Sequence, residues 1–171
     1  MAKTRYIKQR DQYRCGPVAV INTLKFLGVS ITYKSLPIIQ ELCKCANPHG
    51  TDRYDFENAL KKLGVKFERR VRPTLKDIDR HINKGGAILM DYYLGYEDGH
   101  YALCIGRKDK ENYLLVNSDE GPTVAECHRT VYKYMSEWCC LDQEPWCWFV
   151  FPEEINEQRI ARYCYPNQNI A

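Results

Sequence analysis

The feature that most constrains the fold of this chain is a change in hydrophobic pattern near its middle. In the first half, apolar residues recur at helical spacing and glycines follow the periodic segments. In the second half, short runs rich in β-branched, aromatic and aliphatic residues alternate with turn residues. These runs indicate antiparallel strands over 87–93, 100–106, 113–117, 124–131 and 146–151. Helices followed by strands predict an α+β fold, in which an N-terminal helical half packs on an antiparallel β-sheet.

The most clearly predicted helix starts at Pro17 and ends before Gly28. Proline fits the first turn of a helix because its missing N–H removes no hydrogen bond there, and glycine suits the left-handed residue that follows a helix. Similar signals predict further helices over 33–42, 54–63, 75–83 and 132–139, and short strands over 6–9 and 65–71.

Length and charge set the broad class of the protein. A chain of 171 residues fits a single domain over 1–171, in which the polar segment 153–171 either packs as a helix or forms a loosely packed tail. The formal net charge of +3 is small and the basic residues are mixed with acidic ones, so we expect no nucleic-acid partner. The N-terminus lacks the apolar stretch of a signal peptide and no run approaches a membrane span, so we expect no membrane association and a cytoplasmic location.

Nine cysteines are many for a cytoplasmic protein, and their number is odd. In a reducing compartment most are expected to be free thiols, with catalysis or metal binding as special uses. The spacings among Cys43, Cys45, Cys139, Cys140 and Cys147 lack the paired C-x-x-C knuckles of a structural zinc site. We therefore expect no metal and no cofactor.

Cys15 is the cysteine best placed for catalysis. It lies where the polar segment 9–14 meets the predicted helix, so its sulfur should face the positive end of the helix dipole, which favours the nucleophilic thiolate. Gln9 could donate its side-chain amide to an oxyanion together with the backbone N–H of Cys15. Taken alone, Gln9 is more commonly an exposed glutamine without such a role.

A cysteine nucleophile needs a base and a group that orients the base. Of four histidines, only His100 opens a strand whose other residues are apolar, so its ring is well placed to face a cleft; a satisfied or surface histidine is the alternative. If strands 100–106 and 113–117 form a hairpin, the end of the second returns beside His100. Asn117 or Asp119 is then the orienter, although in isolation these two residues indicate only a turn that ends the strand.

The order of these residues resembles that of a known family. Gln9, the Cys-Gly-Pro run at 15–17, the Gly-His-Tyr-Ala-Leu run at 99–103 and the polar end of the next strand are similar to the papain-like peptidases of the C39 type. These include the leader-peptide peptidase domains of bacteriocin exporters and their stand-alone relatives. The resemblance extends over about residues 5–150.

The resemblance implies a papain-like cysteine peptidase fold and names roles for the candidate residues. It implies Cys15 as nucleophile, His100 as base, Asn117 as orienter and Gln9 as oxyanion donor. The family typically has Asp followed by Pro at the third position, where this chain has Asn followed by Ser. Other papain-like enzymes use Asn there, and Asp119 is the alternative orienter.

These residues predict a cysteine peptidase that hydrolyses amide bonds of a peptide or protein substrate. Two alternatives keep the fold and change the chemistry. One is a catalytically inactive peptide-binding or adaptor module, and the other is a thiol acyltransferase, in which an amine instead of water takes the acyl group. A thiol-directed activity probe separates the first alternative from the peptidase, and product analysis with an added amine separates the second.

Overall fold

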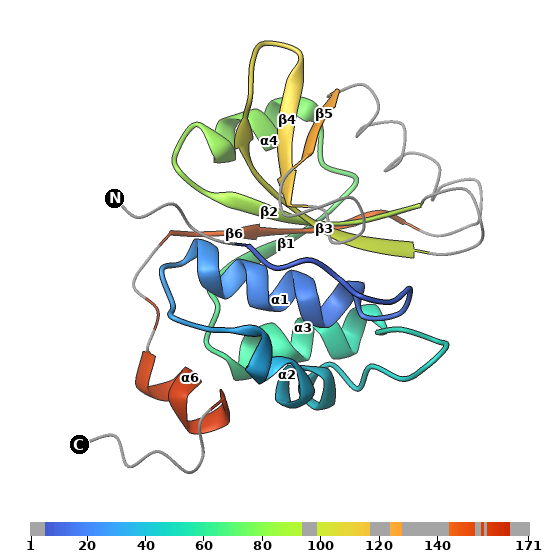
Figure 1. Cartoon of the computed structure of the whole chain (residues 1–171). Coiled ribbons are helices and arrows are strands. Elements are labelled where there is room, and N and C mark those ends of the chain that lie inside the picture. The colour runs from blue at the N-terminus through green and yellow to red at the C-terminus, as the bar shows by residue number, and fades with distance from the viewer. Residues whose placement is uncertain are drawn as a thin grey trace.

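The computed structural model describes residues 6–93, 99–116, 124–127, 144–152, 155 and 157–164. An antiparallel sheet lies between helices that cover both of its faces (Figure 1). This is the α+β arrangement that the order of helix and strand patterns predicts.

Helix α1, Cys15–Phe26, lies against the sheet and is buried on nearly all sides. Its first ten residues are all buried, because the sheet covers one side and two further helices cover the other. The helix begins two residues before the predicted start at Pro17, so Cys15 is its first residue and Arg14 its N-cap. The Arg14 side chain makes no capping hydrogen bond, so the N–H groups of the first turn are not capped by that side chain.

Two further helices complete this layer. A 3-10 turn, Tyr33–Ser35, leads into α2, Leu36–Leu42, and α3 spans Arg53–Lys62. Asp52 caps α3, because its carboxylate accepts a hydrogen bond from the backbone N–H of Tyr54 at 2.8 Å. Both predicted helices of this region are confirmed.

The described residues form a six-stranded sheet in which every neighbouring pair is antiparallel. The strands lie in the order β1-β6-β2-β3-β4-β5 across the sheet. Their bounds are β1 Phe67–Val71, β2 Ala87–Tyr93, β3 Gly99–Arg107, β4 Asn112–Val116, β5 Val124–Cys127 and β6 Trp146–Val150.

Strands β3 and β4 form the predicted hairpin. Leu103 pairs with Val116 and Arg107 with Tyr113, and the register shifts at a bulge before Gly106. The turn is therefore centred near the expected position. Val116, the last residue of β4, pairs with Leu103, which follows His100 by three residues in β3.

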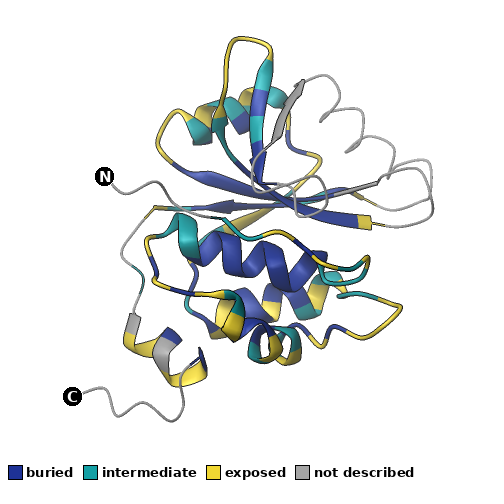
Figure 2. Ribbon diagram, viewed as in Figure 1, coloured by how far each residue is buried: buried dark blue, intermediate teal, exposed yellow. Residues whose placement is uncertain are grey.

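Alternation along the strands divides the core between the two faces of the sheet. Leu103 and Trp148 belong to the cluster packed against α1, α2 and α3. Cys104 and Phe149, the next residue of each strand, belong to the cluster packed against α4, Leu75–Ile82. The central strands β6, β2 and β3 and the helix α1 are consequently buried along most of their described length, whereas no residue of β1 is buried (Figure 2).

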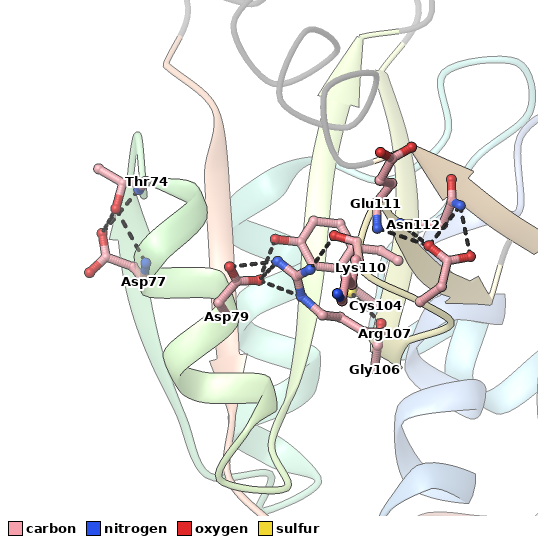
Figure 3. Close-up of polar contacts among 11 residues, drawn as sticks. Thr74, Asp77, Asp79, Cys104, Gly106, Arg107, Lys110, Glu111 and Asn112 are labelled. Carbon is pink, nitrogen blue, oxygen red and sulfur yellow. Dashed lines mark hydrogen bonds and ion pairs between the residues drawn. The ribbon is translucent and has the colours of Figure 1, made fainter.

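Helix α4 begins with the predicted capping box. Thr74 and Asp77 each accept a hydrogen bond from the other's backbone N–H, at 3.2 and 3.0 Å respectively. Two residues further along α4, the carboxylate of Asp79 accepts hydrogen bonds from Arg107 at 2.7 to 3.0 Å (Figure 3) and from the hydroxyl of Tyr113 at 2.7 Å. These contacts fix α4 to the β3–β4 hairpin.

Residues 6–9 do not form the predicted strand. The backbone N–H of Ile7 donates to the side chain of Asn22 at 2.9 Å, and the Asn22 amide donates to the Ile7 carbonyl at 3.1 Å. A side chain of α1 therefore occupies both groups that a strand partner would use.

The predicted helix over 132–139 lies outside the described residues. In the C-terminal segment, helix α6, Glu157–Cys164, lies beside α2 and buries Ile160 and Cys164 in the core (Figure 1). Residues 157–164 therefore adopt the helical alternative for the C-terminal segment. None of the helices in the described ranges is long and apolar enough to cross a membrane.

Candidate active site

The sulfur of Cys15 lies where the start of α1 meets β3. Cys15 is only 6% exposed, and the backbone N–H groups of Tyr101 and Gly16 are directed at its sulfur and stabilise its thiolate form. The N–H groups of a strand point along the plane of the sheet. The sulfur of Cys15 lies beside the backbone at the beginning of β3, and Cys15 belongs to the cluster on the α1 side of the sheet.

Burial dominates the electrostatics of Cys15. Removal from water raises the pKa of its thiol to about 12, although the two backbone N–H groups act in the opposite direction. The expectation that the helix start favours a thiolate is therefore wrong for the resting side chain, which keeps its proton at neutral pH. A nucleophilic role requires a base that removes this proton as the sulfur attacks.

His100 is the second residue of β3 and is 4% exposed. It pairs with Tyr92 of β2 and directly precedes Tyr101, whose N–H faces the sulfur of Cys15. The structure thus brings the candidate nucleophile to the residue adjacent to the candidate base.

The alternation of β3 decides on which face His100 lies. Tyr101 belongs to the cluster on the α1 side and Ala102 to the cluster on the α4 side, and His100 shares the register of Ala102. Cys15 belongs to the cluster on the α1 side together with Tyr101, so the alternation of β3 by itself places His100 on the opposite face of the sheet.

The other histidines differ in their surroundings. His81 is buried on the α4 side, with its Nε2 atom 2.8 Å from the carbonyl oxygen of Val150, so it is a satisfied core histidine. His49 is exposed and lines the same cleft as Cys15, which makes it a second candidate base. His128 lies outside the described residues.

Both candidate orienters, Asn117 and Asp119, also lie outside the described residues. The hairpin on which their assignment depends is confirmed as far as Val116, which pairs with Leu103. Their roles stay predictions.

The loop before Cys15 is organised by Asp11. Its carboxylate accepts hydrogen bonds from the backbone N–H groups of Tyr13 and Arg14 at 3.3 and 3.1 Å. Gln9 is 4% exposed, and its side-chain nitrogen donates to the Asp11 carbonyl. Gln9 is therefore not an exposed glutamine. A carboxamide nitrogen carries two N–H groups, so the contact with Asp11 is compatible with a role as an oxyanion donor.

A cleft of about 730 Å³ opens beside Cys15, between the loops at 11–13 and 47–53 and the facing ends of β2 and β3. Inside it, Arg53 of α3 forms an ion pair with Asp91 of β2, and the two side chains are 17% and 3% exposed. Burial raises the pKa of Asp91 to about 6, although Arg53 lowers it.

The pair formed by Arg53 and Asp91 was not predicted from the sequence. One signal was present, because Asp91 is the only charged residue in the apolar run 87–93. Burial of an unpaired charge is energetically costly, so a charged side chain in a buried strand indicates an oppositely charged partner or a functional role.

Close packing fixes the walls of the cleft. The hydroxyl of Tyr101 donates to the Thr51 carbonyl at 3.2 Å, and its ring stacks on Phe56 of α3. A Cβ at Gly16, the residue after Cys15, would lie 2.8 Å from the Thr51 side chain. The loop at 47–53 therefore lies directly against the start of α1.

Comparisons with known proteins find matches to the structure of this chain but none to its sequence. No protein-family model matches the chain, and no curated protein matches it. Solved structures match over most of the chain. The peptidase domain of Streptococcus ComA, a bifunctional ABC transporter involved in a quorum-sensing pathway, aligns with a TM-score of 0.65 and 18% identity over 88% of this chain and 100% of that chain.

Two further structures agree. The peptidase domain of Streptococcus mutans ComA aligns with a TM-score of 0.57 and 17% identity over 86% of this chain and 99% of its own. A protein of Bacillus anthracis described as a C39-like peptidase aligns with a TM-score of 0.60 and 12% identity over 91% of this chain and 98% of its own. This chain has the C39 peptidase fold.

The predicted papain-like fold of the C39 type is thereby confirmed. At identities of 12 to 18%, the likeness shows the C39 peptidase fold alone. The roles of Cys15, His100, Asn117 and Gln9 must be argued from this chain's own residues.

Proposed function

We propose that this protein is a cysteine peptidase in which Cys15 is the nucleophile and His100 the base. The observation that carries the proposal is the position of the Cys15 sulfur, which faces the backbone N–H next to His100 and borders a cleft. The C39 peptidase fold supports the same reading.

The chemistry begins with a protonated thiol. His100 takes the proton of Cys15 while the sulfur attacks the carbonyl carbon of the scissile amide, which forms a carbon–sulfur bond and an oxyanion. When the carbon–nitrogen bond breaks, the leaving amine takes this proton and a thioester remains. Water then attacks the thioester, gives a proton through His100 to the sulfur, and releases a carboxylic acid. These steps need no metal and no cofactor.

Two donors are proposed for the oxyanion. The backbone N–H of Cys15 is available because it belongs to the first turn of α1, where N–H groups have no partner within the helix. The side-chain amide of Gln9 is the second donor, and one such donor contributes roughly 3 to 4 kcal/mol to lowering the barrier. Asn117 is the proposed orienter of His100, with Asp119 as the alternative.

Incubation with a diverse peptide library, followed by mass spectrometry of new termini, tests the proposal. The wild-type protein should cleave peptides, and Cys15→Ala should not. Cleavage that persists in Cys15→Ala would refute the role of Cys15. A wild-type protein that cleaves nothing would favour the adaptor module, and products that appear only with an added amine would favour an acyltransferase.

A further inference from the structure

The loop before Cys15 contains an ion pair that the proposed mechanism does not use. Arg14 is the N-cap residue of α1 and directly precedes Cys15. Its Nε atom lies 3.2 Å from Oδ2 of Asp11. The ion pair therefore spans most of the loop that separates Gln9 from the proposed nucleophile.

Both carboxylate oxygens of Asp11 act on the same turn. Oδ2 pairs with Arg14, and Oδ1 accepts hydrogen bonds from the backbone N–H groups of Tyr13 and Arg14 at 3.3 and 3.1 Å. A carboxylate that accepts from the backbone two and three residues later closes a tight turn. Because the guanidinium fixes the orientation of this carboxylate, the ion pair helps to set the conformation of the turn at 11–14.

The same turn holds the side chain of Gln9. The side-chain nitrogen of Gln9 donates to the backbone carbonyl of Asp11, and Gln9 is 4% exposed. A carboxamide group is planar and carries two N–H groups, so a contact that fixes one of them also fixes the direction of the other. The conformation at Asp11 therefore determines where the proposed oxyanion donor points.

Other contacts hold the turn from outside the ion pair. Nη2 of Arg14 donates to the Tyr13 hydroxyl at 2.8 Å, and the thiol of Cys45 donates to the Tyr13 carbonyl at 3.3 Å. These bonds restrict the turn to few conformations. A donor to an oxyanion requires such preorganisation, because a donor that must reorient during the reaction loses part of its effect.

A role in stabilising the fold explains the ion pair poorly. The Arg14 and Asp11 side chains are 29% and 25% exposed, and partly exposed ion pairs contribute little to the free energy of unfolding. The described residues that line the cleft include Asp11, Tyr13 and Cys15 but not Arg14. Arg14 would therefore influence a bound substrate through its neighbours.

We infer that Arg14 and Asp11 are positioning residues for the oxyanion site. Their ion pair holds the turn at 11–14 in the conformation that directs the side-chain amide of Gln9. This inference rests on the proposed peptidase function, because Gln9 is the donor that stabilises the oxyanion of that reaction.

Nuclear magnetic resonance of the Gln9 side chain tests the positioning without requiring turnover. The amide signals of Gln9 in nitrogen-15-labelled protein are assigned by their loss in Gln9→Ala. In Arg14→Gln, the exchange of these amide protons with water should be at least about tenfold faster than in the wild type, because the turn that holds them opens more often. Arg14→Lys keeps the cation and should stay closer to the wild type.

Two further substitutions show whether the ion pair itself is responsible. Asp11→Asn removes the charge from the other end and keeps an oxygen for the backbone N–H groups, so it should match Arg14→Gln. Arg10→Gln is the matched control, because the Arg10 guanidinium lies over the ring of Tyr33 at 4.3 Å and forms no ion pair with a described carboxylate. It should leave the exchange of the Gln9 amide within about twofold of the wild-type rate.

A double-mutant cycle with Gln9→Ala tests the consequence for catalysis. On a peptide that the wild type cleaves, Arg14→Gln should lower kcat by about tenfold and leave KM within about twofold, because a misdirected donor is felt mainly in the transition state. In the Gln9→Ala background, the same substitution should change kcat by less than about twofold, since the donor that Arg14 positions is absent. A merely structural effect would reduce kcat by the same factor in both backgrounds.

Unchanged exchange of the Gln9 amide in both Arg14→Gln and Asp11→Asn would overturn the inference, and so would equal losses of kcat with and without Gln9. Thermal melting shows that each variant is folded, and Asp11→Asn keeps the test open if Arg14→Gln does not fold. Failure of the proposed function has a different signature, in which the wild type cleaves no peptide while the exchange of the Gln9 amide still depends on Arg14. Cleavage that Arg14→Gln leaves unchanged retains the peptidase and removes the positioning role.

Discussion

The backbone N–H of Tyr101 is directed at the sulfur of Cys15, so the start of α1 is fixed to the beginning of β3. His100 is the residue before Tyr101, so the candidate base directly precedes the residue whose N–H acts on the candidate nucleophile. Burial raises the pKa of the Cys15 thiol, so this thiol can act as a nucleophile only when a base removes its proton. His100 is the candidate for that base.

Replacement of His100 by alanine should therefore abolish turnover. We expect kcat/KM to fall by roughly 10³-fold or more, because the Cys15 thiol, whose pKa burial raises to about 12, stays protonated without a base. Initial rates on a cleaved library peptide measure the effect. The matched control is His49→Ala, which removes the exposed histidine of the same cleft and should cost much less. A larger loss in His49→Ala would transfer the role of base to His49.

Gln9→Ala should lower kcat by about 10²- to 10³-fold with little change in KM, because a donor to the oxyanion acts mainly in the transition state. Gln12 provides the control, since it has the same side chain and is an exposed residue of the same loop and cleft. Equal losses in Gln9→Ala and Gln12→Ala would contradict the oxyanion role. The melting temperature of Gln9→Ala shows whether its contact with Asp11 also stabilises the loop.

The third member of the triad can be assigned by ranking two substitutions. Asn117→Ala should reduce kcat more than Asp119→Ala, because the polar residue that directly follows β4 is the predicted orienter of His100. The reverse ranking would assign the role to Asp119. Loss of the orienter should also change the pH profile of kcat/KM, which a purely structural residue would leave unchanged.

Elements with local signals could be predicted from the sequence, and contacts between distant elements could not. The helix α1 follows from Pro17 and its apolar spacing, and the β3–β4 hairpin follows from two short runs and one turn. The ion pair of Arg53 and Asp91 joins residues 38 apart in the sequence, and no local pattern specifies that α3 and β2 meet. The raised pKa of Cys15 likewise comes from tertiary burial, which outweighs the helix start that the sequence reveals.

Asp91 should make the protein less stable as the pH rises through the weakly acidic range. Its pKa is raised to about 6 in the folded protein, above the value of about 3.9 for an unfolded aspartate. Between these values the folded chain holds a proton that the unfolded chain has released. The contribution of Asp91 to the free energy of unfolding therefore falls by about 2 kcal/mol between pH 4 and pH 6.5 and is nearly constant above that.

Urea denaturation of the wild type and of Asp91→Asn at several pH values measures this contribution. Only the difference between the two proteins is informative, because carboxylates such as Glu57, whose pKa is lowered, act in the opposite direction. The stability of the wild type relative to the variant should decline from pH 4 to pH 6.5. Parallel curves for the two proteins would show that Asp91 is not buried as described.

Gly86→Ala should destabilise the fold from the face opposite the cleft. A Cβ at this position would lie 2.3 Å from Nε2 of His81, and that atom lies 2.8 Å from the carbonyl oxygen of Val150. The ring cannot move aside without losing this contact and its edge packing on Phe149. We expect a loss of about 2 to 4 kcal/mol in the free energy of unfolding, measured by urea denaturation.

The control for this substitution is Gly106→Ala, because a Cβ at Gly106 would meet no atom within 4 Å. It should change the free energy of unfolding by less than about 1 kcal/mol. A Gly86→Ala protein as stable as the Gly106→Ala protein would mean that His81 does not pack against residue 86. Cys15 alkylation should persist in a folded Gly86→Ala protein, because residue 86 contacts the α4 side of the sheet and the sulfur borders the cleft at the start of α1.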